Sequence, residues 1–529
     1  MSKQKRREKQ DAEKRKLTED VLSGRAKIAF YKIDNKYAQS NRKGGATPTD
    51  EEADEMTQRY ARLLRVLLPG ILVILSQIYD PRDQNRIDYV ESQLMLFGIL
   101  MFLSHCSSRR AANRELANKN LLDLVKEFVP GAKDMPHADT LARLLCVIDV
   151  EQIDRYYEEM LVEFLHSKQF QERNPGRFLT AIDGTQKFSR KYLWDERLLR
   201  QNAGDEEKQR YYVYVVESVL ILENGMVLPL LTEILENLVE DNSLPCEIII
   251  EKEKKEASEQ EKKQECETKA FHRMAERLVK LLGKGVVTVV LDGIYASGPV
   301  ISRCQNYGWE YMIVLKRGSL KTVWEDFDGL QRIEPENTHY AQWGNRQQEY
   351  HWSNDLEYIY GDNHKVLKLN LVTCTETWIE EHPRSGKKTE KKVTQYAWLS
   401  SQRVTSNNVF HLCTKIARPR WKIENKILVE KHQGYQYSNC YSYNWNAMKG
   451  FHYLMKFGVF LNAYITHCVT VVEYVRAEGI RGFVKKIWEI IRQGKWPACD
   501  KTEDRIEPIN LEARPGRKRI HWPPLIKSA

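Results

Sequence analysis

The sequence predicts an α/β protein in which a mixed sheet is flanked by helices, with an all-helical region before it and a β-rich insertion within it. Apolar residues recur at helical spacing over 57–168, as in YARLLRVLLPGILVILSQIY. From Arg177 the pattern changes to short apolar runs that are typical of strands. Between Gly318 and Gln395 it becomes a series of alternating segments rich in Trp, Tyr, Thr and His. These changes of pattern separate the regions of the predicted fold.

A regular series of strands and helices follows Arg177. RFLTAID is a short strand that ends in a carboxylate, and YYVYVVESVLILENGMVLPLLTEIL contains two strands joined by the turn Glu223-Asn224-Gly225. The amphipathic helix FHRMAERLVKLL leads to GVVTVVLD, which is apolar enough for a buried strand. The helix GPVISRCQNYG then precedes the strand EYMIVLKR. The order β-β-β-α-β-α-β is that of an RNase H-like core, and helical stretches at 407–433 and 444–493 follow the insertion.

The composition is that of a globular chain with a mild basic excess. Hydrophobic residues make up 42% of the 529 residues, and 82 Lys and Arg outnumber 73 Asp and Glu. The excess lies near the ends: residues 1–48 hold 14 Lys or Arg against 6 Asp or Glu, and 514–527 are also basic. Both ends are suited to contact nucleic acid, or they are solvated tails.

No feature of the sequence indicates secretion or membrane insertion. The first twenty residues are charged and not apolar, so we expect no secretory signal. The apolar stretches 63–75 and 94–103 are shorter than the roughly 20 residues that a membrane helix needs. We therefore expect a cytoplasmic protein without a membrane partner.

Two aspartates stand where strands are predicted to end. Asp183 closes the first strand in A-I-D-G-T, and Asp292 closes the most apolar strand in V-L-D-G-I. If the two strands are neighbours, both carboxylates emerge at one edge of the sheet. They could hold divalent ions that activate the attacking oxygen and stabilise the leaving oxygen in phosphodiester cleavage. Taken singly, either aspartate could instead form a turn or cap a helix.

A third carboxylate lies in the helical stretch ARPRWKIENKILVEK. Arg420, Glu424 and Lys431 are spaced i, i+4 and i+11, which at about 100° per residue places them on one narrow face. This face would present one metal ligand between two cations, an arrangement suited to a scissile phosphate. The alternative without a catalytic role is an exposed helix face on which these residues form ion pairs.

These residues carry a resemblance to a known family. The spacing R-x3-E-x6-K within R-W-x-I-E-N resembles the signature helix of bacterial insertion-sequence transposases of the IS-four family, Y-x2-R-x3-E-x6-K. The tyrosine of that signature falls at Ala417, so its phosphate contact is lost or comes from another residue. The likeness covers roughly 177–463, and P-H-A-D-T-L-A-R-L-L resembles the segment before the catalytic core of related transposases.

The resemblance implies a DDE transposase that binds double-stranded DNA, both transposon ends and target, and acts as a homodimer on DNA. Asp183, Asp292 and Glu424 would be the catalytic ligands of two Mg²⁺ or Mn²⁺ ions. Arg420 and Lys431 would contact the DNA backbone.

Trp398, in Y-A-W-L-S-S, resembles a Trp on which some members of the family stack a flipped base. Stacking requires an exposed aromatic face. A strand Trp is more often a core residue, so both roles remain open.

On this basis we divide the chain into six segments. They are a basic, flexible N-terminal segment (1–50), a helical region expected to bind DNA ends (51–170), the first part of the RNase H-like core (171–317), the β-rich insertion (318–395), the second part of the core with the catalytic helix (396–443), and a C-terminal helical region with a basic tail (444–529).

Two other functions are compatible with the sequence. One is a transposase-derived protein that binds DNA without cutting it, against which an intact carboxylate triad argues. The other is an RNase H-like nuclease that cleaves without joining. Elsewhere, His137 is expected to cap a helix or to be a hydrogen-bond partner, and the mixed-charge run 251–269 is expected to be a solvated helix or loop.

Overall fold

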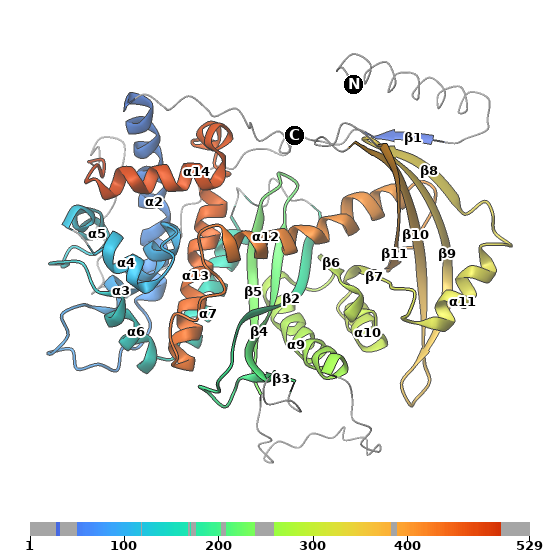
Figure 1. The fold of residues 1–529 in the computed structure, drawn as a ribbon, viewed down its shortest axis with the longest axis horizontal. Coiled ribbons are helices and arrows are strands. Elements are labelled where there is room, and N and C mark those ends of the chain that lie inside the picture. Colours follow the sequence, from blue (N-terminus) through green and yellow to red (C-terminus); the bar gives the residue numbers. More distant parts are fainter. Residues whose placement is uncertain are drawn as a thin grey trace. The chain divides into compact units, whose positions relative to one another are not determined.

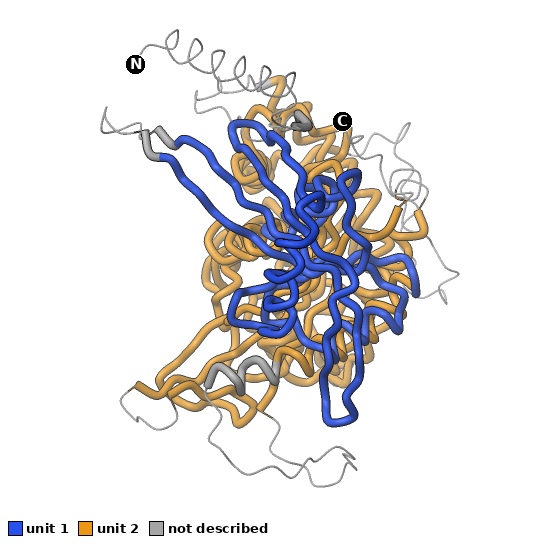
Figure 2. The backbone as a smooth tube through the Cα atoms, turned by 90° about the vertical axis from the view of Figure 1, so that its right-hand side faces the viewer, with its two compact units in different colours: residues 1–39, 284–421 blue, residues 40–283, 422–529 orange. Residues whose placement is uncertain are grey.

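The chain forms two compact units (Figure 2). The smaller unit contains residues 1–39 and 284–421, and the larger unit contains residues 40–283 and 422–529. The boundary between Gly283 and Lys284 falls inside the segment that we expected to be the first part of one core. The computed structural model describes residues 28–31, 50–117, 119–167, 170, 176–202, 208–237, 259–381 and 389–498. Except for 28–31, the basic terminal segments lie outside these residues.

The larger unit begins with the helices that the sequence predicts. His137 caps one of them, since its Nδ1 accepts a hydrogen bond from the backbone N–H of Asp139, and that prediction is confirmed. In Figure 1 these helices are α2 (Asp50–Leu75), α3 (Glu91–Leu103), α4 (Arg109–Glu115), α5 (Leu122–Phe128), α6 (Ala138–Val147) and α7 (Glu151–Leu165).

Helix α3 is buried along almost its whole length because α13 (Trp445–Ile465) packs closely against it. Two glycines allow this close approach. A Cβ atom at Gly98 would lie 2.7 Å from Leu454 Cδ1, and one at Gly458 would lie 2.7 Å from Phe102 Cβ. Apolar side chains on all sides of α3 therefore reflect a central helix of the larger unit, not a membrane span. Among the described residues, no helix is both long and apolar enough to cross a membrane.

The sheet of the larger unit is antiparallel. Strand β4 (Arg210–Ile221) pairs along one edge with β2 (Phe178–Arg190). Along its other edge it pairs with β5 (Val227–Leu235) and with the short β3 (Leu199–Gln201). The predicted turn joins β4 to β5, and Gly225 there has a φ of 89° that favours glycine.

The two faces of this sheet are covered by different helices. On one face, Glu217 of β4 contacts Lys456 of α13. On the other, Tyr214 donates a hydrogen bond of 2.5 Å to Glu267 of α9 (Glu259–Leu282). Glu267 belongs to the mixed-charge run that we expected to be solvated, yet it is 4% exposed. For this residue the prediction is wrong, because the run continues into a helix that packs on the sheet.

The smaller unit contains a mixed sheet with the strand order β1-β8-β9-β10-β11-β7-β6. Strands β6 and β7 pair in parallel, and so do β1 and β8. The other four pairs, β8 with β9, β9 with β10, β10 with β11, and β11 with β7, are antiparallel. The strands are β1 (Ile28–Tyr31), β6 (Val287–Leu291), β7 (Glu310–Val314), β8 (Thr338–Trp343), β9 (Arg346–Tyr360), β10 (Lys365–Glu381) and β11 (Thr389–Ser400).

Two helices accompany these strands. Helix α10 (Gly298–Asn306) connects β6 to β7, so the predicted β-α-β order is confirmed for this part of the chain. Helix α11 (Lys321–Leu330) opens the predicted β-rich insertion, and it buries Val323, Trp324 and Phe327.

The predicted helical stretch before the C-terminal region is continuous but changes its winding. A π-helix (His411–Ala417) passes into a 3₁₀ turn (Arg418–Arg420) and then into α12 (Trp421–His432). The predicted C-terminal helical block is confirmed as α13 and α14 (Val472–Arg492), the latter kinked at Gly479.

Candidate active site

Asp183 lies in the middle of β2, not at its end. The strand continues to Arg190, and Asp183 is directly opposite Glu217 of β4 in the antiparallel ladder. The half-buried side chain of Asp183 accepts a hydrogen bond of 3.0 Å from the backbone N–H of Gly184. The prediction that a strand ends at Asp183 is therefore wrong.

The glycine after Asp183 explains this error. Asp-Gly is typical of a turn, but here Gly184 pairs with Val216 within the ladder. A Cβ atom at Gly184 would lie 2.7 Å from the Tyr214 hydroxyl and 3.1 Å from Glu267 Cδ. Gly184 is thus required by the close approach of side chains on the α9 side of the sheet.

Helix α12 lies on the same side of β2 as the Asp183 carboxylate. Lys431 donates a hydrogen bond of 2.6 Å from Nζ to Thr185 Oγ1, and Thr185 is two residues after Asp183 and so shares its face of the strand. Burial lowers the pKa of the Lys431 ammonium, and the nearby Asp183 carboxylate opposes this effect. Glu424 is seven residues before Lys431 on the same face of α12, about 10 Å along the helix axis. The larger unit therefore brings Asp183 to the helix face that carries Glu424 and Lys431.

Asp292 belongs to the smaller unit and follows β6 directly, as predicted. All five residues of β6 are buried, whereas Asp292 is half-buried. It is the first residue before the 3₁₀ turn Gly293–Tyr295, and its side chain makes no capping hydrogen bond there. Its backbone carbonyl accepts a hydrogen bond of 3.1 Å from the N–H of Tyr295, so Asp292 does open a turn, as the alternative for this residue states, but its carboxylate does not cap that turn.

Arg420 and Trp398 also belong to the smaller unit, and both are buried. Arg420 is 5% exposed, and its guanidinium lies over the ring of Trp421 at 4.7 Å. Trp398 is 4% exposed, and its ring stacks on that of Tyr396 with centroids 5.7 Å apart. In this conformation neither side chain presents an open surface to DNA.

A buried cluster of charges lies beside Asp183 in the larger unit, and sequence reasoning missed it. Both carboxylate oxygens of Glu217 are occupied. Oε1 accepts a 3.0 Å hydrogen bond from the Tyr437 hydroxyl and lies 3.3 Å from His452 Nε2. Oε2 accepts a 2.8 Å hydrogen bond from Thr232 and lies 3.3 Å from Lys456 Nζ. With its oxygens so engaged, Glu217 is suited to hold the sheet beside Asp183 and not to bind a metal.

Lys187 of β2 completes this cluster. Its ammonium donates to the backbone carbonyl of Tyr437 at 2.7 Å and lies 3.3 Å from His452 Nδ1. Since an ammonium only donates, the proton of neutral His452 is on Nε2, which faces Glu217.

Burial and neighbouring charges set the protonation states of the cluster. Burial, aided by Lys187, lowers the pKa of His452 to about 4. Burial also lowers the pKa of Lys187 to about 8. Burial alone would raise the pKa of Glu217, but Lys456 and His452 hold it well below its usual value. At neutral pH the cluster therefore contains an ionised carboxylate, a neutral imidazole and buried ammonium groups.

The signal for this cluster was present in the sequence. Glu217 interrupts the apolar run YYVYVVESVLIL, Lys456 interrupts FHYLMKFGVF, and each stands where a charged side chain must be buried. Such residues need partners, but the sequence does not say which ones. Strand β5, helix α13 and the segment after α12 supply them to Glu217, and Tyr437 and Lys456 come from positions 220 and 239 residues away in the chain.

Comparison with known protein families gives a match within the helical region. Residues 72–160 match the family model described as DDE_Tnp_1-associated. This segment, associated with DDE-type transposases, lies in the helical part of the larger unit and covers less than half of the chain. No curated protein matches the sequence.

Proposed function

We propose that this protein is a DDE transposase, which cleaves DNA at transposon ends and joins the freed end to a target. The match of residues 72–160 to a DDE transposase-associated segment carries this proposal. Its support from the structure is the contact between α12 and β2, where Lys431 meets Thr185 beside Asp183. We also propose that the protein is a member of the IS-four family and has an RNase H-like core. The family rests on the signature spacing, and the core rests on the order of elements.

The proposed catalytic residues are Asp183, Asp292 and Glu424. Their carboxylate oxygens are the donors that Mg²⁺ and Mn²⁺ prefer, so the chemistry of the donor set fits two such ions. Among the described residues, no group of three or more His, Cys, Asp or Glu side chains is placed to hold a metal. Bound ions would activate an attacking oxygen and stabilise a leaving one.

Other residues of the chain would orient the DNA. Lys431 already has its ammonium beside Asp183, where it would meet the negative charge of a scissile phosphate. Arg420 would contact the backbone only after its buried guanidinium became accessible. The Glu217 cluster would keep β2 and β4 in register, so that Asp183 holds its position. The partner is double-stranded DNA, bound by a homodimer.

The test is a cleavage and strand-transfer assay with labelled duplexes that carry the inverted repeats flanking the gene, with Mg²⁺, with Mn²⁺ and with a chelator. We expect metal-dependent nicks at the repeat ends followed by joined products. Asp183→Ala, Asp292→Ala and Glu424→Ala should each abolish cleavage while binding persists. Asn425→Ala, on an exposed position of the same helix, is the matched control and should cleave normally.

Each outcome separates the alternatives. Binding without cleavage by the unmodified protein would favour a transposase-derived DNA-binding protein. Cleavage without joined products would favour a nuclease. Cleavage by one carboxylate variant above about one-tenth of the normal rate, roughly 1.4 kcal/mol of transition-state stabilisation, would remove that residue from the triad. Light scattering of the DNA complex tests the homodimer.

Trp398 has its own test because it is buried. A core role predicts that Trp398→Ala lowers the free energy of unfolding by about 3–5 kcal/mol and depresses all activities together. A base-stacking role predicts a normal first nick and a loss confined to the second-strand step.

A further inference from the structure

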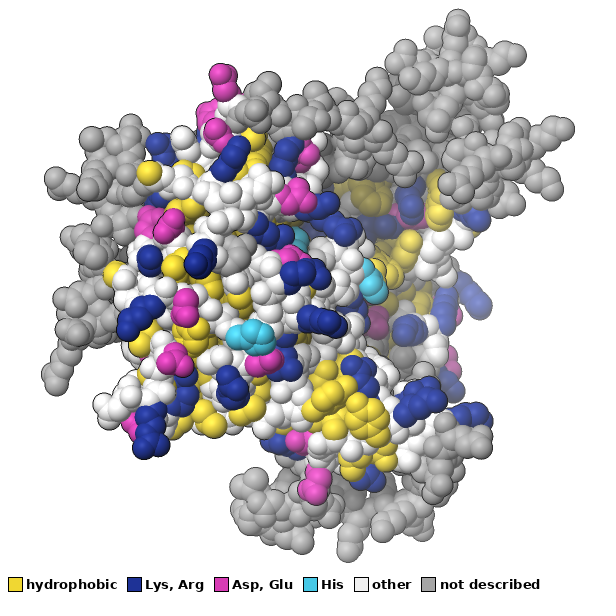
Figure 3. Space-filling view, turned by 60° about the vertical axis from the view of Figure 1, so that its left-hand side comes forward, with side chains coloured by type: hydrophobic (Ala, Val, Ile, Leu, Met, Phe, Trp, Pro, Cys, Tyr) yellow, Lys and Arg dark blue, Asp and Glu magenta, His cyan; other side chains and the backbone are white. Residues whose placement is uncertain are grey.

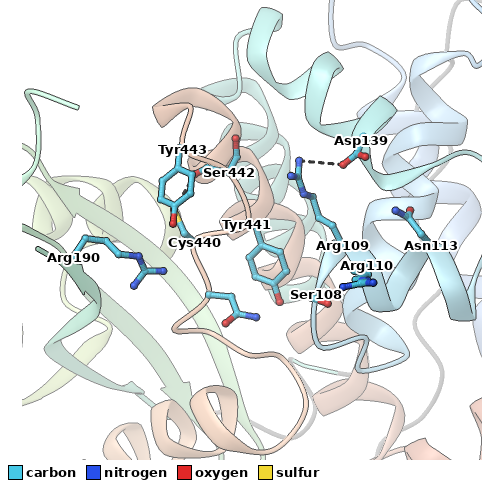
Figure 4. A pocket seen from close by; sticks show the side chains of 11 residues that line it. Ser108, Arg109, Arg110, Asn113, Asp139, Arg190, Cys440, Tyr441, Ser442 and Tyr443 are labelled. Atoms are coloured by element: carbon cyan, nitrogen blue, oxygen red, sulfur yellow. Dashed lines mark hydrogen bonds and ion pairs between the residues drawn. The ribbon is translucent and has the colours of Figure 1, made fainter. Parts of the chain in front are cut away.

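A cavity of about 570 Å³ lies within the larger unit, and no function has been assigned to it above. Figure 4 shows Arg190, at the end of β2, entering from one side and Arg109 and Arg110 of α4 from the other. The segment Cys440–Tyr443 lies between them. Figure 3 shows that Lys and Arg side chains also gather elsewhere on the surface, but in this cavity three arginines line one hollow.

The charge of this cavity is not balanced. Arg109 lies 3.5 Å from Asp139, the one carboxylate among the lining residues. Neither Arg110 nor Arg190 has a carboxylate partner in the described part of the chain, and Arg190 instead lies over the Phe188 ring at 5.1 Å. Guanidinium groups remain protonated at any physiological pH and form paired hydrogen bonds to phosphate oxygens. The cavity therefore favours an anion with several oxygen acceptors.

Exposed aromatic rings adjoin the arginines. Tyr192 and Tyr443 are 52% and 54% exposed, and their ring centroids are 6.1 Å apart. Trp194 packs edge-on against Tyr443 at 5.7 Å and fixes that ring from behind. Large exposed rings beside arginines that lack a carboxylate partner, as Arg110 and Arg190 do, are typical of surfaces that bind the bases and backbone of an unpaired nucleic-acid strand.

We propose that this cavity binds a phosphodiester of an unpaired DNA strand, with the adjacent base stacked on Tyr443 and Tyr192. This proposal rests on the proposed function, because a transposase must hold a strand that has been separated from its complement during cleavage or joining. Arg110 and Arg190 contact the phosphate, while Arg109 is held in place by Asp139. The cavity is lined by the DDE_Tnp_1-associated segment through α4, so it gives that segment a specific contact with DNA.

The experiment consists of three measurements of fluorescence anisotropy with the full-length protein, with a chelator present so that no cleavage occurs. The first probe is a short labelled oligothymidine, and the second is the same strand without bases. The third measurement follows the labelled oligothymidine while inorganic phosphate is added as a competitor. Arg110→Ala and Arg190→Ala should each weaken binding of both strands about fivefold or more and reduce the slope of log K against log salt by about one. Arg114→Ala is the matched control, since Arg114 is on the same helix, its side chain is 75% exposed and it does not line the cavity.

The tyrosine separates stacking from charge. Tyr443→Ala should weaken binding of the oligothymidine on the order of tenfold more than it weakens binding of the strand without bases, whereas Tyr443→Phe, which removes only the hydroxyl that bonds to Arg190, should keep the preference for the strand with bases. Equal effects of Arg110→Ala and Arg114→Ala would overturn the proposal. Displacement of the strand by inorganic phosphate at comparable concentration would reduce the cavity to a simple anion site and overturn it too. Cleavage assays fail or succeed independently of these binding data, so loss of the proposed function and loss of this site are distinguishable.

Discussion

Each unit of the protein buries a carboxylate on a central strand, but the two units neutralise it with different cations. In the smaller unit, Glu376 of β10 is fully buried; Arg346 contacts Oε2 at 2.7 Å, and Arg418 and Gln348 contact Oε1. In the larger unit, Glu217 is held by Lys456, Tyr437, Thr232 and His452, as described above.

The partners differ in whether they can lose a proton. Guanidinium groups stay charged at every pH at which the protein folds. The guanidinium of Arg418 also lies over the rings of Trp343 at 4.6 Å and Tyr396 at 4.8 Å, which fixes its geometry. In contrast, burial lowers the pKa values of Lys187, Lys456 and His452 in the larger unit. In the smaller unit, the cations that neutralise Glu376 cannot lose a proton. In the larger unit, the groups that neutralise Glu217, beside Asp183, can.

The largest effect is expected for Glu376→Gln. This substitution leaves two arginines without their carboxylate, and neither can relieve the imbalance by losing a proton. We expect the free energy of unfolding of the smaller unit to fall by about 3–5 kcal/mol. The fall should be the same at about pH 6 and at about pH 9, because arginine does not titrate between these values. Hydrogen exchange of peptides from β9 and β10 measures it. A smaller loss of unfolding free energy at the higher pH would contradict the idea that the charges around Glu376 do not titrate.

A somewhat smaller effect is expected for Glu217→Gln. Near neutral pH the larger unit should lose about 3 kcal/mol, because the Lys456 ammonium is left buried without a carboxylate. The pKa of Lys456 is already lowered by burial, so removal of Glu217 lowers it further below its unfolded value. A lysine with a lowered pKa binds fewer protons folded than unfolded, so the stability of the variant rises with pH. Exchange of β4 peptides should show the loss shrinking toward alkaline pH; a constant loss would argue against this mechanism.

Lys187→Met isolates a single titration. Lys187 has a pKa of about 8 in the folded protein, below its ordinary value of 10.5. The unfolded chain therefore binds more protons above pH about 8, and the unmodified protein gains stability relative to the variant as pH rises. Between pH about 8 and about 9.5 this relative gain should be about 1–2 kcal/mol. Urea titrations of both proteins test it, and parallel pH profiles would assign Lys187 no titration in this window.

The smallest effect is expected at a surface ion pair of the smaller unit. Arg317 and Asp328 approach to 2.7 Å, but their side chains are 53% and 44% exposed. Because water screens such a pair, Asp328→Asn should change the free energy of unfolding by less than about 1 kcal/mol. A loss as large as that of Glu376→Gln, measured by the same hydrogen exchange, would mean that burial does not distinguish these sites.

The sequence by itself determined the elements whose signals are local. Helical periodicity gave the helices before β2 and after β11, and Asn224-Gly225 gave the turn between β4 and β5, because spacing and backbone conformation depend on near neighbours. The placement of Asp292 directly after a fully buried strand follows from the same kind of signal. So does the common face of Glu424 and Lys431, since both lie on one regular helix.

Only the tertiary structure decided what lies next to these elements. Gly184 resembles a turn residue in sequence, but it pairs with Val216 inside the ladder of β2 and β4, and Tyr214 and Glu267 occupy the space that a Cβ atom would need. Glu217 resembles an isolated charge until α13 and the segment after α12 bring Lys456, His452 and Tyr437 to it. The physical reason is the same in each case: the cost of burying a charge or of adding a Cβ atom depends on atoms contributed by distant parts of the chain, and local pattern contains no information about them.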